Sequence, residues 1–295
     1  MSTAPESQAR MSHVYEIGGF QISLDSFPFH ESEFLAAFRK ECRQGSDLRM
    51  TVREVRSIPI PNGIAVENVG ETTYRDEFAR RVRICKNEQK DAILYRVTEL
   101  EPGRLLAEIT SKAAAQLGSY LVLRWLELPR FFLERDAVFL HASVVRWQGR
   151  AILFSGQKQI GKSTQAELWR RFRGAEVLNG DRALLRRMDG LWMACGSPFC
   201  GTSGICVNGK IPIAAIVLLQ KSPYNRIEPV DLKRTFAAFL SGCTFDAQNR
   251  MEAEHVLSLA EQIHREVPIF QLCCTPDEKA VLCLEKAMKG EYNDV

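Results

Sequence analysis

One octapeptide restricts the fold of this chain more than any other segment. Residues 156–163 read Gly-Gln-Lys-Gln-Ile-Gly-Lys-Ser and fit the pattern G-x-x-x-x-G-K-[ST] in full. The pattern forms a phosphate-binding loop when a strand precedes it and a helix follows it. Both are expected here, because residues 151–155 are an apolar strand-like run and residues 164–173 carry apolar side chains at helical spacing. The sequence therefore predicts an α/β fold around this loop.

The chemistry of the loop predicts ATP and Mg²⁺ as ligands. Glycines let backbone N–H groups turn inward around phosphate oxygens, the motif lysine Lys162 reaches the β- and γ-phosphates, and the Ser163 hydroxyl binds Mg²⁺. The following helix directs its positive N-terminus at the same anion. We expect nucleotide contacts from the loop and the first helical turn: Gly156, Gln157, Lys158, Gln159, Ile160, Gly161, Lys162, Ser163 and Thr164.

The strand before the loop is predicted to close an antiparallel hairpin. Residues 137–145 (AVFLHASVV) form the first strand, and Gln148-Gly149 is a two-residue turn. Extending the register of this hairpin pairs Arg146 with Ala151, Val144 with Leu153, and His141 with Gly156. His141 would then lie beside the first glycine of the loop. The alternative is a buried histidine bonded to a backbone carbonyl.

An acidic residue is expected near the phosphates, and Asp181 is the candidate. It follows the loop helix in the segment Asn179-Gly180-Asp181. A P-loop kinase uses such a carboxylate to hold Mg²⁺ or to take the proton of the attacking hydroxyl. The alternative is a turn aspartate, since this composition favours turns by itself. Arg182 and Arg186 could pair with phosphate or lie on the surface.

A second glycine-rich loop, residues 196–204, precedes an expected short strand over residues 205–207. Its hydroxyls and mobile backbone could contact the acceptor or the nucleotide. Loops of this composition also serve as plain connections.

The first half of the chain is predicted to be an α+β domain over residues 1–135, in which the sequence identifies no chemistry but which could serve as a substrate-docking domain. The second half is predicted to be a P-loop domain with a mixed sheet over residues 136–295. Residues 1–12 are expected to be loose. The expected elements of the first half are a hairpin over 14–24, a helix over 31–43, strands over 50–55, 64–66, 81–85 and 93–97, and one long helix over 112–133 that stops or bends at Pro129. Those of the second half are strands over 177–178, 183–185, 211–219 and 269–273, helices over 232–240 and 251–265, and a last helix capped by Thr275.

Composition limits the partners of the chain. Its 39 basic and 36 acidic residues give a net charge of +3, which offers no reason to expect nucleic acid or a membrane surface as a partner. Nine cysteines without a secretory signal predict reduced thiols and a cytoplasmic location. Cys195, Cys200 and Cys206 do not have the spacing of a zinc site, so all cysteines are interpreted as small packed residues. Self-association as a homo-oligomer stays open.

The second half resembles the HPr kinase/phosphorylase-related family of P-loop kinases, whose fold is similar to that of PEP carboxykinase. The resemblance covers about residues 137–290 and rests on His141, the loop 156–163, the segment 178–182 and the segment 201–205. It implies that His141 and Asp181 are catalytic or contact phosphate, with Lys162 and Ser163 as nucleotide and Mg²⁺ contacts.

The chain departs from this family at three places. Lys158-Gln159 stands where the family has Ser-Gly, Gly180-Asp181 stands where it has paired aspartates, and the second glycine-rich segment lacks its acidic and arginine neighbours. These differences argue against HPr as the substrate and against the phosphorylase reaction. Divergent relatives of this kind resemble kinases of peptide-modification systems.

The predicted function is an ATP- and Mg²⁺-dependent kinase that phosphorylates a serine- or threonine-type hydroxyl on a peptide or protein. Its catalytic residues would be Asp181, His141 and Lys162, and Ser163 and Asp181 would hold the metal. Two alternatives stay open: a kinase of a small molecule such as free serine or a polyol, and a nucleotide-dependent binding protein without phosphoryl transfer.

Overall fold

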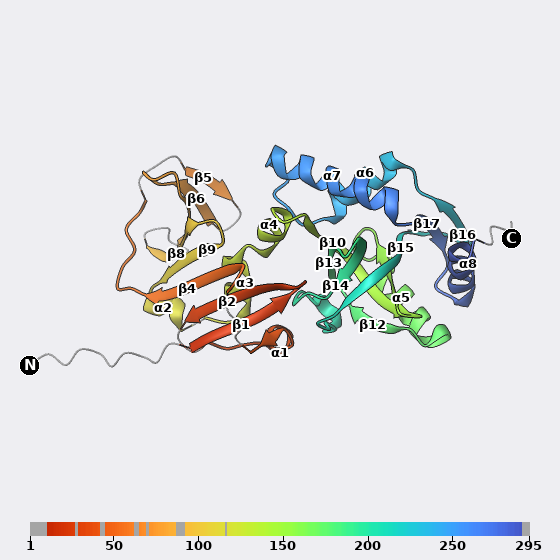
Figure 1. Ribbon diagram of the computed structural model, residues 1–295, viewed down its shortest axis with the longest axis horizontal. Coiled ribbons are helices and arrows are strands. Elements are labelled where there is room, and N and C mark those ends of the chain that lie inside the picture. Colours follow the sequence, from red (N-terminus) through yellow and green to blue (C-terminus); the bar gives the residue numbers. More distant parts are fainter. Residues whose placement is uncertain are drawn as a thin grey trace, which may run out of the picture. The chain divides into compact units, whose positions relative to one another are not determined.

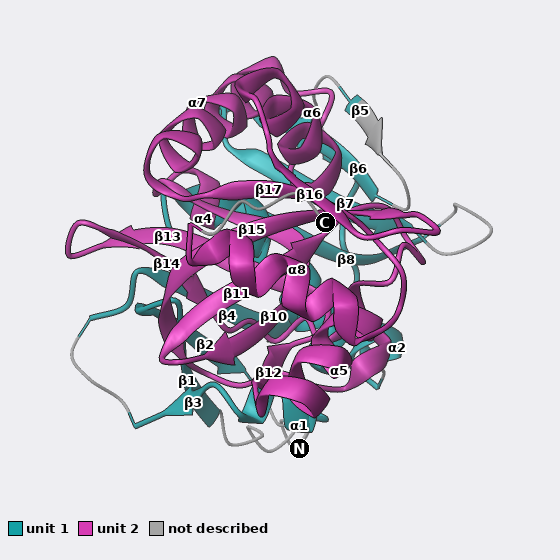
Figure 2. Ribbon diagram, turned by 90° about the vertical axis from the view of Figure 1, so that its right-hand side faces the viewer, with its two compact units in different colours: residues 1–131 teal, residues 132–295 magenta. Residues whose placement is uncertain are grey.

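The computed structural model describes residues 11–26, 29–41, 45–61, 65–68, 71–86, 92–115 and 117–290. The chain divides into two compact units, residues 1–131 and 132–295 (Figure 2). Each unit is built on a large sheet with both parallel and antiparallel neighbours, accompanied by helices. The fold is α/β, as the sequence predicted.

The first unit contains a nine-stranded sheet of order β3-β1-β2-β4-β9-β8-β7-β6-β5 (Figure 1). Strands β2 and β9 both run parallel to β4, and the other neighbours are antiparallel. The strands are β1 Met11–Ile17, β2 Phe20–Ser26, β3 Arg39–Lys40, β4 Leu48–Glu54, β5 Ala65–Asn68, β6 Glu71–Arg75, β7 Arg81–Lys86, β8 Ile93–Glu101 and β9 Arg104–Ile109. Strands β6 and β9 were not predicted.

The first hairpin is confirmed. Ile17 pairs with Phe20, and Gly18 and Gly19 form the turn with φ of 59° and 88°. Of the residues predicted to be loose, 1–10 lie outside the described residues, whereas Met11 and Ser12 belong to β1.

The helix expected over residues 31–43 is much shorter. Helix α1 spans Glu33–Ala36, and β3 follows it. The backbone carbonyl of Phe38 accepts a hydrogen bond from Glu16 of β1, and Tyr15 pairs with Arg39. Pairing with β1 therefore replaces the helix after one turn.

The long helix expected over residues 112–133 is wrong. The segment contains α2 Ser111–Ala114, α3 Ser119–Leu126 and α4 Leu128–Leu133. Gly118 is extended and forms a bridge with His30, and Glu127 adopts a left-handed conformation with φ of 45°. Pro129 lies in the first turn of α4, where its missing N–H costs no helical hydrogen bond.

The second unit contains an eight-stranded sheet. Its order is β11-β10-β13-β14-β15-β17-β16, with β12 paired to β10, and β11 pairs again with β15, so that five strands close a ring. The strands are β10 Ala137–Trp147, β11 Arg150–Ser155, β12 Glu176–Asn179, β13 Arg182–Met188, β14 Leu191–Cys195, β15 Lys210–Lys221, β16 Arg226–Pro229 and β17 Ile269–Cys274.

Helices cover both faces of this sheet (Figure 2). Helices α5 Lys162–Arg173 and α8 Glu278–Met288 pack in one core with Ile152 and Phe154. Helices α6 Leu232–Gly242 and α7 Arg250–Glu266 pack in the other core with Leu153. Successive residues of β11 thus enter opposite cores, which is why this strand is apolar throughout.

Two expectations for the second unit need correction. The last helix begins at Glu278 and is capped by Asp277, because Thr275 instead exchanges hydrogen bonds with Asn225. Residues 205–207 form a single bridge between Cys206 and Asn179, not a strand. The helices predicted over 232–240 and 251–265 are confirmed as α6 and α7.

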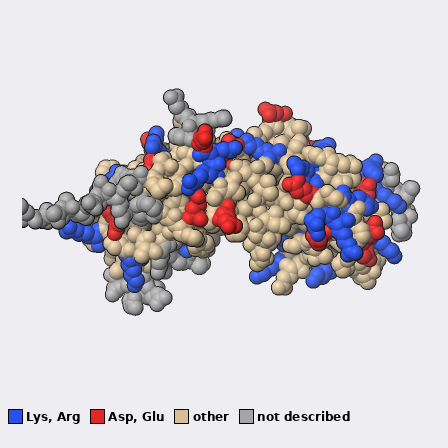
Figure 3. All heavy atoms as spheres, turned by 90° about the horizontal axis from the view of Figure 1, so that it is seen from below, with Lys and Arg blue, Asp and Glu red and all other residues tan. Residues whose placement is uncertain are grey.

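Within the described part of the chain, no helix combines the length and apolar character that a membrane span requires. On the face drawn in Figure 3, basic side chains are interspersed with acidic ones.

Candidate functional site

A cavity of about 940 Å³ lies at the end of β11, where the chain passes into α5. Strands β11, β15 and β17 run parallel, so their carboxyl ends meet at this edge of the sheet. Ligands of α/β sheets bind outside such ends. The lining residues predicted from sequence are His141, Gly156, Gln157, Lys158, Gln159, Ile160, Lys162, Ser163 and Asp181.

The hairpin that leads to the loop is as predicted over most of its length. Arg146 pairs with Ala151 and Val144 with Leu153, around a turn in which Gln148 and Gly149 have φ of 49° and 74°. Positive φ at both positions is the type I′ turn that matches the twist of the strands.

The loop itself has a backbone that favours an anion. Gly156 and Gly161 have φ of 142° and 118°, and a side chain at Gly156 would lie 3.4 Å from the carbonyl oxygen of Leu219. Gly161 caps α5 without a side chain, so no side chain occupies the first N–H groups of this helix. The free helix terminus fits a phosphate group.

Lys162 is 8% exposed and folds back onto the loop. Its Nζ donates hydrogen bonds to the carbonyl oxygens of Gly156 and Gln157, each at 3.1 Å. Burial lowers the pKa of Lys162, and the charge of Asp181 opposes that shift. An ammonium group has three donors, so one remains for an anion in the cavity.

His141 reaches the loop by a different route from the predicted one. The pairing of His141 with Gly156 is wrong: β10 pairs with β11 from Ala142 onward, whereas His141 pairs with Arg182 of β13. The strand changes partner at this point. His141 still borders the loop, because the Ser155 hydroxyl donates to its backbone carbonyl at 3.0 Å.

Asp181 contacts the imidazole of His141 through both its backbone carbonyl group and its carboxylate. Its Nδ1 lies 2.9 Å from the backbone carbonyl oxygen of Asp181 and 3.2 Å from Oδ1 of the Asp181 carboxylate. A carbonyl oxygen can only accept, so Nδ1 carries a proton and donates. In the neutral ring Nε2 is then the proton acceptor.

The Asp181 carboxylate is held in its charged form. The hydrogen bond from His141 lowers the pKa of Asp181, burial opposes this, and the charges of Arg182 and Lys162 lower it further. Its ordinary pKa is already 3.8, so the carboxylate is ionised at neutral pH. An ionised carboxylate is a good cation ligand and a weak base.

The sequence placed Asn179 in a turn. In the structure its side chain also forms hydrogen bonds with both the Asp181 turn and the second glycine-rich loop. It is 1% exposed, and its Oδ1 accepts from the backbone N–H groups of Asp181 at 2.9 Å and Arg182 at 2.8 Å. Its Nδ2 donates to the carbonyl oxygens of Ser197 at 3.2 Å and Phe199 at 3.4 Å. Asn179 thus ties Asp181 to the second glycine-rich loop. The signal in the sequence was an asparagine two residues before an acid.

The second glycine-rich loop lies directly against Asp181. A side chain at Gly201 would come within 2.8 Å of Cβ of Asp181, and one at Gly180 within 1.9 Å of the Ser203 hydroxyl. Gly201 and Thr202 line the cavity from η1 Gly201–Ser203. Contact of this loop with an acceptor or nucleotide stays a prediction.

Sequence reasoning missed one wall of the cavity. Ala238, Ser241 and Gly242 of α6 line it, with Gln220 of β15 and Gln271 of β17. A Cβ atom built on Gly242 would lie 3.7 Å from the Ser155 hydroxyl oxygen, so α6 lies close to β11, the strand before the loop. No local sequence pattern links α6 to the loop, because the two segments are distant in the sequence and only the folded sheet brings them together.

The donor set fits Mg²⁺ only together with a phosphate ligand. Ser163 and Asp181 line the same cavity, but among the described residues no three His, Cys, Asp or Glu side chains gather to hold a metal on their own. Mg²⁺ is typically bound by one or two protein oxygens, substrate phosphates and water. The residues present therefore fit a metal that arrives with a nucleotide.

No model of a protein family and no curated protein sequence matches the chain. One solved structure to which the chain is similar is the HPr(Ser) kinase/phosphatase from Coxiella burnetii, at 14% sequence identity. The similarity covers 52% of this chain and 93% of that chain, with a TM-score of 0.30. That score is too low to transfer an activity, so any functional conclusion must come from the site.

Proposed function

We propose that the second unit is a kinase that uses ATP and Mg²⁺ to phosphorylate a hydroxyl group. The observation that carries the proposal is the meeting of Lys162, Ser163 and the His141–Asp181 pair at one cavity. A phosphate loop alone supports nucleotide binding. The addition of an ionised carboxylate and an imidazole supports transfer, since phosphoryl transfer needs a group that orients or deprotonates the attacking hydroxyl.

The side chains of the cavity would have different roles in the reaction. Lys162 and the N-terminus of α5 would bind the phosphates and stabilise the charge that develops during transfer. Ser163 and Asp181 would hold Mg²⁺, which neutralises phosphate charge when it is bound. The loop N–H groups would fix the phosphate position.

His141 and Asp181 would handle the proton of the acceptor. Asp181 orients the imidazole through Nδ1, and the 35% exposed His141 side chain has Nε2 available as a proton acceptor. The low pKa of Asp181 makes its carboxylate a weak base. We therefore assign Asp181 to orientation and metal contact, and assign proton removal to the pair as a unit.

The proposed acceptor is a serine or threonine hydroxyl of a peptide or protein. The cavity lies near the upper end of the range of about 300–1,000 Å³ typical of ligand pockets, which supports room for an acceptor beside the nucleotide. The rival acceptor is a small alcohol such as free serine or a polyol. The first unit is available as a docking surface for a peptide.

The test is transfer from radiolabelled ATP. The protein would be incubated with Mg²⁺ and a serine- and threonine-containing peptide library, and separately with free serine and polyols. Labelling of peptides that is lost in Asp181→Asn supports the proposal. Labelling of a free alcohol alone would reassign the acceptor, and ATP binding without any transfer would leave a nucleotide-dependent binding protein.

A further inference from the structure

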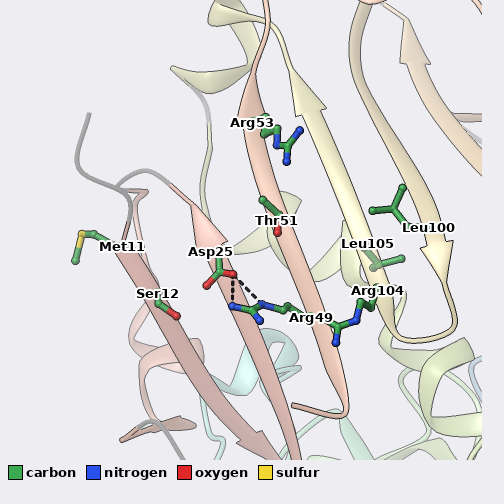
Figure 4. Close-up of a pocket in the computed structure, with 9 residues that line it drawn as sticks. All are labelled: Met11, Ser12, Asp25, Arg49, Thr51, Arg53, Leu100, Arg104 and Leu105. Atoms are coloured by element: carbon green, nitrogen blue, oxygen red, sulfur yellow. Dashed lines mark hydrogen bonds and ion pairs between the residues drawn. The ribbon is translucent and has the colours of Figure 1, made fainter. Parts of the chain in front are cut away.

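A basic hollow lies on the sheet of the first unit, far along the chain from the phosphate loop. Its volume is about 570 Å³, and its charged lining residues are Arg49 and Arg53 of β4, Arg104 of β9 and Asp25 of β2 (Figure 4). We call these four residues the arginine hollow. The sequence identified no chemistry in this half of the chain.

The arrangement concentrates like charges. Arg49 pairs directly with Arg104 across β4 and β9, and Arg53 lies four residues along β4 on the same face. Like charges directly opposite each other destabilise a sheet, and side chains at even spacing share one face. The placement therefore gathers three guanidinium groups on one face of β4 and β9.

The hollow has more positive than negative charge. Arg49 uses Nε and Nη2 to bind Oδ2 of Asp25, each at 2.9 Å, and Arg104 forms an exposed ion pair with Glu101 at 2.7 Å. Across the described ranges of the chain, no acidic side chain pairs with Arg53. The second carboxylate oxygen of Asp25, Oδ1, likewise accepts no hydrogen bond from the residues that are described.

We propose that the arginine hollow binds an extended peptide segment rich in Asp and Glu. The arginines would bind carboxylates, and Oδ1 of Asp25 would accept a peptide N–H. The lining residues lie on the neighbouring strands β1, β2, β4, β9 and β8, and adjacent strands of a sheet are about 4.8 Å apart. That width fits an extended chain better than a compact small ion.

The surroundings favour a peptide over a nucleic acid. Met11 and Leu100 flank the arginines and are 44% and 45% exposed, which offers contacts for apolar side chains. Among the described residues that line the hollow, none is aromatic, so none offers a ring on which a base could stack. A phosphodiester backbone also has no N–H from which Oδ1 of Asp25 could accept a hydrogen bond.

The test is fluorescence anisotropy with the full chain and a labelled short peptide of alternating Glu and Thr. We expect binding that weakens as salt rises, because exposed charges are screened. The double substitution Arg53→Glu with Arg104→Glu should weaken binding at least tenfold. Arg53→Gln removes one positive charge that has no ion-pair partner among the described residues, so it should leave folding intact and weaken binding about threefold.

The matched control is Arg250→Glu with Arg265→Glu in α7, which changes the net charge equally at exposed positions. It should bind the peptide as the unmodified chain does. Equal affinity of the unmodified chain and the arginine-hollow double variant would overturn the proposal. Tighter binding of an oligothymidylate of the same charge would overturn it as well. Neither measurement depends on kinase activity.

Discussion

The imidazole Nδ1 of His141 lies 2.9 Å from the backbone carbonyl oxygen of Asp181 and 3.2 Å from the carboxylate of the same residue. The two contacts fix both the tautomer and the orientation of the ring. They also couple the two side chains, since the hydrogen bond from His141 is the largest cause of the low pKa of Asp181. His141 and Asp181 therefore act as one unit, although β10 and the turn before β13 supply them separately.

The first prediction concerns Lys162. Lys162→Ala should abolish Mg²⁺-dependent ATP binding in calorimetry, because Lys162 lines the cavity and is the motif's contact to the β- and γ-phosphates. The matched control is Lys233→Ala on the exposed side of α6, which should bind ATP normally. ATP affinity in Lys162→Ala equal to that of the unmodified chain would contradict the site.

The same residue gives a prediction for stability. The pKa of Lys162 is lowered by burial, so the folded state disfavours its charged form. Below the pKa that Lys162 has in the folded state, its charged form lowers the free energy of unfolding. This loss disappears as the pH rises above the ordinary lysine pKa of 10.5. Lys162→Met should therefore leave the unfolding temperature at pH 7 unchanged or raised without ATP. ATP should raise that temperature for the unmodified chain only.

The second prediction concerns the His141–Asp181 pair. Asp181→Asn and His141→Gln should each lower kcat by about 10²–10⁴-fold with little change in nucleotide affinity, since each removes part of one proton-handling unit. The double variant should lose no more than the more damaging single variant, because residues that act as a unit are not additive. Additive losses in kcat would show that the two side chains act independently.

The third prediction is the pH dependence. Asp181 has a lowered pKa, so its contribution to stability is present above its ordinary pKa of 3.8 and is lost as the pH falls through the lower folded value. The difference in unfolding free energy between the unmodified chain and Asp181→Asn should be constant from about pH 5 to 8 and shrink in acid.

Local rules predicted the hairpin well and failed at its end. The type I′ turn at Gln148-Gly149 and strand alternation set the pairs from Trp147–Arg150 to Ala142–Ser155. The same rule extended to His141 was wrong, because β13 takes over the pairing there. A change of partner depends on a strand that is distant in sequence, which no turn rule reports.

The same limit explains the other errors. Gly118 interrupts the expected long helix because it pairs with His30, and Phe38 leaves the expected first helix to bond with β1. The role of Asn179 depends on carbonyl oxygens of Ser197 and Phe199, which the fold alone brings to it. The position of the eight-residue loop between a strand and a helix could be predicted from the sequence, whereas the residues that position Asp181 beside it could not.

The last prediction follows from Asn179. Asn179→Ala leaves the N–H groups of Asp181 and Arg182 and the Ser197 carbonyl without their partner, in a place where Asn179 is 1% exposed. Each unsatisfied buried group costs about 1–3 kcal/mol, so thermal or urea unfolding should show a loss of at least roughly 3 kcal/mol for the three groups. Because the turn that carries Asp181 loosens, kcat should fall at least tenfold while ATP affinity changes little.

Ser197→Ala separates stability from positioning. It removes the hydroxyl that donates to the Arg182 carbonyl at 2.6 Å but leaves the hydrogen bonds that the N–H groups of Asp181 and Arg182 donate to Oδ1 of Asn179. We expect it to cost about 1 kcal/mol of stability and to keep kcat within about threefold, since the Asp181 turn is intact. An equal fall of kcat in both variants would mean that Asn179 acts through general stability and does not position Asp181.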